Sequence, residues 1–183
     1  MRELRLLKII LVAIFFASPA FAQDQAPAGL QAAGCGPNET TFNVEIDKKV
    51  HTIGQPVDGK ALVYVFADEV GDNAKLVVGP VITRIGVDGQ WMGAFKLKSY
   101  LYFPVDGGDH RLCVSQQSDL KSRREKYAAA TTFTAESGKA YYFRTMTPDH
   151  PRPDNLVKIV PVDPAQAQLM IAKAALSTSK SKN

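Results

Sequence analysis

The 183-residue chain carries 22 Lys and Arg residues against 18 Asp and Glu residues, for a net charge of +4 at pH 7. A charge this close to neutral gives no indication of a nucleic-acid partner. With 45% hydrophobic residues, the chain can bury a core, and its length is typical of a single domain.

Residues 1–22 have the three parts of a cleavable signal peptide. Basic residues come first, an apolar run follows at 9–16, and small side chains stand at Ala20 and Ala22. We expect cleavage between Ala22 and Gln23. The mature chain then has 161 residues and a net charge of +2, because the leader holds three basic residues and one acidic residue.

An uncleaved membrane anchor is the alternative interpretation of the leader. A membrane span needs roughly 20 apolar residues, and Ser18-Pro19 ends the apolar run too early for that. No later stretch is apolar enough to cross a bilayer. We therefore expect a mature protein without a transmembrane segment, located in the bacterial periplasm or secreted.

Residues 23–40 are rich in Ala, Gly, Gln and Pro without periodicity, which is typical of a flexible segment. They contain Cys35, and the second cysteine of the chain is Cys113. In an oxidising compartment an isolated pair is more often a disulfide than two free thiols. Alternation in the strand-like run 110–115 also places Cys113 on the more polar face, which disfavours a buried core thiol. We expect a Cys35–Cys113 disulfide.

A rival interpretation of Cys35 is a lipid anchor, because Ala33-Gly34-Cys35 superficially resembles a lipoprotein acylation site. The apolar run ends near residue 17, far ahead of this cysteine, and Ala32 stands where a large aliphatic residue is usual. Lipidation is therefore disfavoured.

Short β-type runs separated by turn residues recur from residue 41 onward. The most apolar of them, 61–66, is typical of a central strand. The Asp88-Gly89 pair predicts a type I′ hairpin turn, because both central residues of that turn need positive φ. The expected strands cover residues 41–46, 61–66, 77–87, 90–97, 100–105, 110–115, 131–134, 140–147 and 156–162.

Only the end of the chain has a helical pattern. Asp163 is a favourable N-cap with Pro164 at the first helical position, and the apolar spacing predicts a helix over 165–176. Residues 177–183 are polar and predict a disordered tail. The sequence thus predicts one domain over 41–176, a mainly β, antiparallel β-sandwich with a short C-terminal α-helix.

Several of these strand and turn motifs resemble the bacterial domain-of-unknown-function family numbered 2846 over about residues 55–165. The resemblance implies a sandwich like transthyretin (prealbumin) and the carboxypeptidase-regulatory domains, usually behind a signal peptide or a lipoprotein leader. It implies no catalytic residue. The motifs are the run 59–66, Val87-Asp88-Gly89 with Gly93, Tyr100-Leu101-Tyr102, the run 108–112 and the run 138–144.

No motif predicts a metal or a cofactor. The three histidines, His51, His110 and His150, lack the spacing of a metal-binding motif. The acidic loop 68–73 has oxygen ligands that suit calcium, but without the ordered spacing of a known calcium loop, so we favour a solvated connection. The basic cluster 121–126 is a candidate contact for anionic lipid or an acidic polymer, although a polar loop between strands is the favoured interpretation.

The aromatic residues form the most informative group. Trp91, Tyr100, Tyr102 and Tyr142 fall on neighbouring or paired segments, and a flat aromatic surface on a secreted sandwich is suited to stacking on sugar rings or contacting a partner protein. We take these four as candidate ligand-binding residues. The alternative is that they cover the edge of the core.

Two classes of function remain. The first is a non-catalytic binding or interaction module of the cell envelope, whose partner is an unidentified envelope protein or polysaccharide. The second is an extracellular hydrolase or metal-dependent enzyme with a site assembled from distant residues such as His110, Asp109 and Glu136. We favour the first, because nothing local in the sequence supplies a nucleophile with its base.

Overall fold

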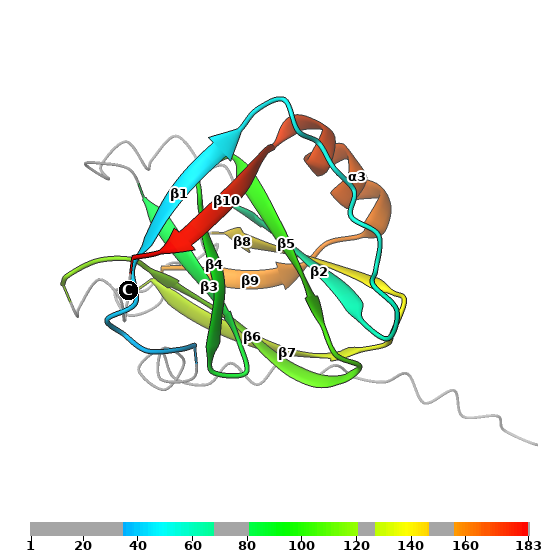
Figure 1. The fold of residues 1–183 in the computed structure, drawn as a ribbon, viewed down its shortest axis with the longest axis horizontal. Coiled ribbons are helices and arrows are strands. Elements are labelled where there is room, and N and C mark those ends of the chain that lie inside the picture. The colour runs from blue at the N-terminus through cyan, green and yellow to red at the C-terminus, as the bar shows by residue number, and fades with distance from the viewer. Residues whose placement is uncertain (1–34, 68–80, 121–126, 147–155, 183) are drawn as a thin grey trace, which may run out of the picture.

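The structure is a computed structural model that describes residues 35–67, 81–120, 127–146 and 156–182. The expected cleavage site at Ala22 and Gln23, the acidic loop 68–73 and the basic cluster 121–126 lie outside these residues. The described residues form two β-sheets and one short helix (Figure 1). The elements are β1 (Phe42–Asp47), β2 (Ala61–Ala67), β3 (Ile82–Val87), β4 (Gln90–Lys96), β5 (Ser99–Val105), β6 (Gly108–Gln116), β7 (Ala128–Ala135), β8 (Ala140–Met146), β9 (Lys158–Pro161), α3 (Pro164–Lys173) and β10 (Ala175–Ser181).

The larger sheet has six strands in the order β1-β10-β5-β2-β8-β9, and the smaller sheet has four in the order β4-β3-β6-β7. The prediction of a mainly β sandwich with a short C-terminal helix is confirmed. The smaller sheet is wholly antiparallel. In the larger sheet, β2 pairs with β8 and β10 pairs with β5 in parallel, so that sheet is mixed. A parallel pair needs a long connection, and between β2 and β8 the chain forms β5 and all four strands of the smaller sheet.

The core lies between the two sheets and follows the period-two alternation of their strands. β2 is buried along its whole length, as its apolar run predicts. Its Ala61, Val63 and Val65 join the core between the sheets. Leu62 and Tyr64 instead point to the outer face of the larger sheet, where a second apolar cluster lies.

The end of the chain differs from the prediction. Asp163 caps α3 as expected, because its carboxylate accepts hydrogen bonds from the backbone N–H groups of Ala165 and Gln166. The helix ends at Lys173, however, and the tail over 177–183 is not disordered in its described part. Ala175–Ser181 form β10, which pairs with β1 along its length.

Serine hydroxyls explain why a polar tail folds as a strand. Ser177 is buried, and its Oγ lies 2.7 Å from Ser99 Oγ. Ser179 Oγ accepts a hydrogen bond from the backbone N–H of Ala94 at 3.0 Å. Polar composition predicts disorder only where no partner is available, and here the partners come from strands β4 and β5.

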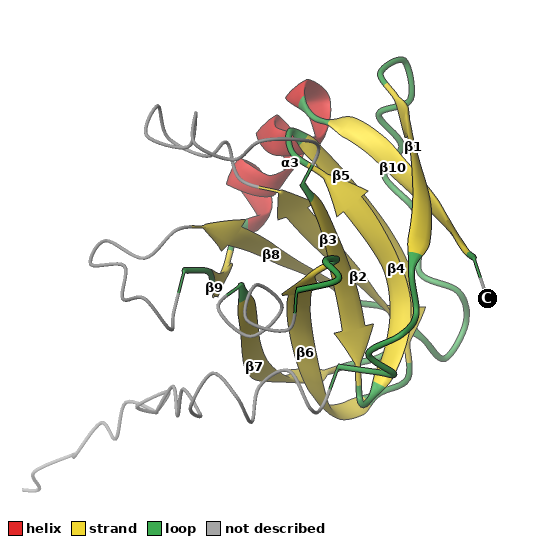
Figure 2. Cartoon of the chain, turned by 90° about the vertical axis from the view of Figure 1, so that its left-hand side faces the viewer, coloured by secondary structure: helices red, strands yellow, loops and turns green. Residues whose placement is uncertain are grey.

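Two segments cover the outer face of the larger sheet. One is α3 (Figure 2). The other, which we call the strap, is the stretch of residues 48–60 that leads from β1 to β2 and runs beside α3 (Figure 1). The two are joined where His51 Nδ1 lies 3.0 Å from the carbonyl oxygen of Ile171. The outer face of this sheet is therefore a second, covered core.

Candidate functional site

Trp91 lies on the outer face of the smaller sheet because a β-bulge interrupts β4. The strand register passes over Met92, which is one extra residue on β4 between Trp91 and Gly93. Strict alternation from Phe95, which faces the core, would turn Trp91 inward. The extra residue reverses that, and Trp91 packs instead with a separate apolar cluster on the outer face.

Three contacts hold the indole ring of Trp91 in place. Its Nε1–H donates to the carbonyl oxygen of Pro37 at 2.7 Å. The guanidinium carbon of Arg84 lies 4.4 Å from the ring centroid, within the range of a cation–π interaction. The backbone of Gly36 packs directly on the ring. Trp91 is therefore half-buried and rigidly held, and the adjacent Met92 is 38% exposed.

Arg84 is the central residue of this region, and the sequence analysis did not identify it. Its side chain is only 1% exposed. The guanidinium donates to the carbonyl oxygens of Asn38 and Thr40, each at 2.9 Å, and to Ser115 Oγ at 3.3 Å. The available signal was an arginine inside a strand-like run, where a cation is unfavourable unless it has buried partners.

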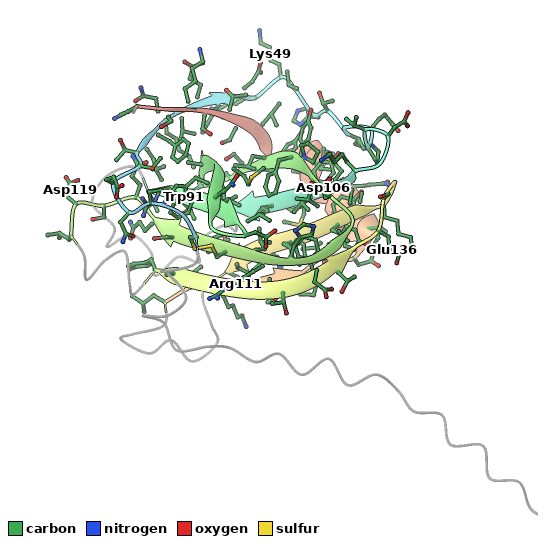
Figure 3. All side chains as sticks on the ribbon, turned by 60° about the horizontal axis from the view of Figure 1, so that its bottom comes forward. Lys49, Trp91, Asp106, Arg111, Asp119 and Glu136 are labelled. Carbon is green, nitrogen blue, oxygen red and sulfur yellow. A yellow bond between two sulfur atoms is a disulfide. The ribbon has the colours of Figure 1, made fainter. Side chains whose placement is uncertain are left out.

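The expected disulfide is present and fixes the first described residues on the smaller sheet. The bond joins Cys35 to Cys113 on β6, and both residues are fully buried (Figure 3). Gly86, beside Cys113 in the sheet, allows this approach, because a Cβ on it would lie 2.1 Å from the carbonyl oxygen of Cys35. Residues 35–40 are thus anchored, in contrast to the flexible segment expected for 23–40.

The candidate tyrosines lie on the other sheet, with Tyr64 at their centre. The ring centroid of Tyr64 is 5.1 Å from that of Tyr142, 5.2 Å from that of Tyr102 and 6.4 Å from that of Tyr100. Tyr64 and Tyr100 are fully buried, and Tyr102 and Tyr142 are half-buried. We call these four residues the tyrosine cluster.

The tyrosine cluster is covered by the strap. Tyr64 donates a hydrogen bond to the carbonyl oxygen of Gly54 at 3.3 Å, and Tyr100 donates to that of Thr52 at 3.2 Å. Burial is the main cause that raises the pKa of Tyr64 to about 12, and neighbouring tyrosines add to it. Burial also raises the pKa of Tyr100. Both phenols stay protonated at neutral pH and act as hydrogen-bond donors.

The structure does not bring Trp91 and the three candidate tyrosines to one surface. Trp91 belongs to the cluster on the smaller sheet, whereas Tyr100, Tyr102 and Tyr142 belong to the cluster on the outer face of the larger sheet. Tyr100 also has no exposed surface, whereas Tyr102 and Tyr142 are only half-buried, so the flat aromatic surface expected from the sequence is only partly open. Alternation along β5 puts Tyr100 and Tyr102 on one face, but it could not reveal the strap that lies over this face.

His110 lies between two turns, and both of its ring nitrogens have acceptor partners. Its Nδ1–H donates to Asp88 Oδ2 at 2.6 Å, and its Nε2–H donates to the backbone carbonyl oxygen of Asp106 at 2.8 Å. Burial opposes a charged ring, but these two hydrogen bonds outweigh it and raise the pKa of His110. Burial likewise opposes the charge of Asp88, while hydrogen bonds from the Arg111 N–H and from His110 lower its pKa.

The residues proposed to assist His110 have other partners. Asp109 accepts a hydrogen bond from Thr134 Oγ1 at 2.6 Å. Glu136 forms an ion pair with Lys139 at 2.7 Å. Figure 3 labels Asp106 and Glu136 in the turns at this end of the molecule.

No group of three or more His, Cys, Asp or Glu side chains among the described residues is placed to hold a metal ion. No helix in the same part of the chain has the length and apolar character needed to cross a membrane.

Comparison with known proteins places the chain in a family. A family model described as "Protein of unknown function (DUF2846)" matches residues 57–157, more than half of the chain. This match confirms the resemblance carried by the strand and turn motifs. No curated protein and no solved structure matches the chain.

Proposed function

We propose that this chain, which belongs to the DUF2846 family, is an exported, non-catalytic binding module of the bacterial cell envelope. The single observation that carries the proposal is the preorganised indole of Trp91. A ring that is already fixed loses little conformational entropy when it contacts a ligand. We define the Trp91 surface as the exposed part of the Trp91 ring together with the exposed residues Met92, Pro37 and Asn38.

The Cys35–Cys113 disulfide supports export. Disulfides persist outside the cytoplasm and are rare within it, and the leader of residues 1–22 has the pattern of a signal peptide. The bond also holds the segment that carries Pro37, so the oxidised form is the one in which the indole is fixed.

The contacts of His110 support a non-catalytic role. A general base needs a ring nitrogen within reach of the proton that it removes. Both nitrogens of His110 face acceptors instead, and Asp109 and Glu136 are directed to Thr134 and Lys139. The alternative hydrolase would have to dismantle this arrangement before it could act.

The test is a titration of the mature protein with soluble peptidoglycan fragments and envelope polysaccharides, followed by tryptophan fluorescence. Trp91 is the single tryptophan of the chain, so the signal reports on this surface alone. We expect a saturable shift that Met92→Lys weakens at least tenfold. Val57→Lys, which alters an exposed residue of the strap, is the matched control and keeps wild-type binding.

Two outcomes contradict the proposal. One is a wild-type protein that binds no member of the panel, or that binds with equal affinity after Met92→Lys. The other is turnover of a panel member that His110→Ala abolishes, which would favour the enzyme.

A further inference from the structure

The strap crosses the tyrosine cluster without joining the sheet. Residues 50–57 have no regular secondary structure, and His51, Thr52, Ile53, Gln55 and Val57 are exposed. β2 beneath the strap is already paired with β5 on one side and with β8 on the other. β2 therefore has no free edge with which the strap could pair.

The hydroxyl groups of the tyrosine cluster bind the strap through its backbone. Tyr64 donates to the carbonyl oxygen of Gly54, and Tyr100 donates to that of Thr52. These acceptors are two residues apart, and in an extended chain such carbonyl groups point the same way with a repeat of about 6.6 Å. Two neighbouring phenols thus hold alternate carbonyl groups of the strap, at 3.3 Å for Gly54 and 3.2 Å for Thr52.

The strap lies so close to the rings at Gly54 that a side chain at this position would collide with its neighbours. A Cβ on Gly54 would lie 2.8 Å from Cε2 of Tyr102 and 3.0 Å from Cδ2 of Leu62. The backbone of the strap therefore lies directly on the aromatic surface. No side chain of the strap supplies the two tyrosine hydrogen bonds, so another extended segment with a glycine at this position would make the same ones.

We propose that the tyrosine cluster is a binding site for an extended, glycine-containing segment of a partner polypeptide, and that the strap is its internal competitor. This site lies on the opposite sheet from the Trp91 surface, so it is independent of that surface. Strap and partner compete for the same donors, which lowers the apparent affinity of the partner by the fraction of molecules whose strap is open. If about 1% are open, the affinity falls roughly 100-fold.

The test uses a synthetic peptide of residues 50–58 as the external ligand, measured by calorimetry with the mature protein. In one variant, a glycine-free Ser-Glu linker of equal length replaces residues 51–57, so that no residue of the linker can lie against the rings as Gly54 does. In a second, Gly54→Val pushes the strap off the rings. We expect both to bind the peptide at least tenfold more tightly than the wild type. Gln55→Ala, which changes an exposed side chain of the strap, is the control and behaves as the wild type.

Two further measurements identify the site. Adding Tyr64→Phe and Tyr100→Phe to the linker variant removes both donors and should weaken the peptide about tenfold. Tyrosinate absorbance should show the high pKa of Tyr64 falling towards its ordinary value when the strap is replaced and rising again when the peptide binds.

The proposal is wrong if the linker and Gly54→Val variants fold but bind the peptide no better than the wild type, or if the phenylalanine changes leave binding intact. It is also wrong if neither variant folds, because the strap would then not be displaceable. None of these outcomes affects the titration of the Trp91 surface, whose fluorophore and probes are different.

Discussion

Replacing both Cys35 and Cys113 by alanine should destabilise the protein strongly. The disulfide joins residues separated by 78 positions. For a loop of that size, the loss of chain entropy in the unfolded state is worth about 4 kcal/mol. In a chain of this length that corresponds to a melting temperature lower by about 8–16 °C.

The double variant should also have a local signature. Without the bond, the segment that carries Pro37 is held mainly by its contacts with Arg84 and Trp91. We therefore expect Trp91 to become more accessible to a soluble quencher at temperatures well below the melting transition. Thermal melts followed by circular dichroism, together with fluorescence quenching, measure both effects.

Wild-type protein kept oxidised and wild-type protein fully reduced under denaturing conditions are the controls. A double variant that melts within about 2 °C of the oxidised wild type would refute this account of the bond. Free thiols at both positions in protein taken directly from the cell envelope would refute it as well.

Three other changes have definite outcomes. Gly86→Ala should lower stability by about 2–3 kcal/mol in urea titrations and expose Trp91, because its Cβ would lie 2.1 Å from the Cys35 carbonyl oxygen; an unchanged midpoint would contradict this. Arg84→Lys should cost about 2–4 kcal/mol, because lysine cannot reproduce three directed hydrogen bonds and the stacking; a cost below about 0.5 kcal/mol would be inconsistent with the contacts described. The stabilisation lost in His110→Ala should be largest near pH 5–6, because the raised pKa of His110 makes its contribution complete below about 6.5 and the lowered pKa of Asp88 preserves its charge there. This loss of stability should fade as the pH rises through the folded pKa of His110. A difference in melting temperature between wild type and His110→Ala that does not change with pH would show that the ring is not charged.

Local patterns predicted most of the sandwich. The apolar run 61–66 became β2, which is buried throughout. The Asp88-Gly89 pair forms the expected hairpin turn with φ angles of 51° and 84°. Such features depend on a few neighbouring residues, which is why periodicity and turn chemistry suffice for them.

The features that were not predicted from the sequence depend mostly on contacts beyond the immediate neighbours. β10 is polar, and its order comes from pairing with β1 and from the hydroxyl contacts of its serines. The outward position of Trp91 comes from one extra residue, Met92, which no alternation rule anticipates. The burial of Tyr64 and Tyr100 comes in part from a strap that follows β1.

Arg84 shows how a buried polar centre escapes prediction. Arg84 donates to two backbone carbonyl groups, at Asn38 and Thr40, and a carbonyl group leaves no trace in the sequence. The disulfide was predictable because only two cysteines exist. That bond and Arg84 act on the same segment, so the pairing of Cys35 is a clue that residues 35–40 are ordered.

Binding at the Trp91 surface is tested most directly by a map of NMR chemical-shift changes on the mature protein as soluble peptidoglycan fragments and envelope polysaccharides are added. We expect saturable changes centred on the indole N–H of Trp91 and the amide of Met92, with the fragments left intact. Changes centred on His110 together with cleavage of a fragment, or no saturable change with any probe, would contradict the proposed binding.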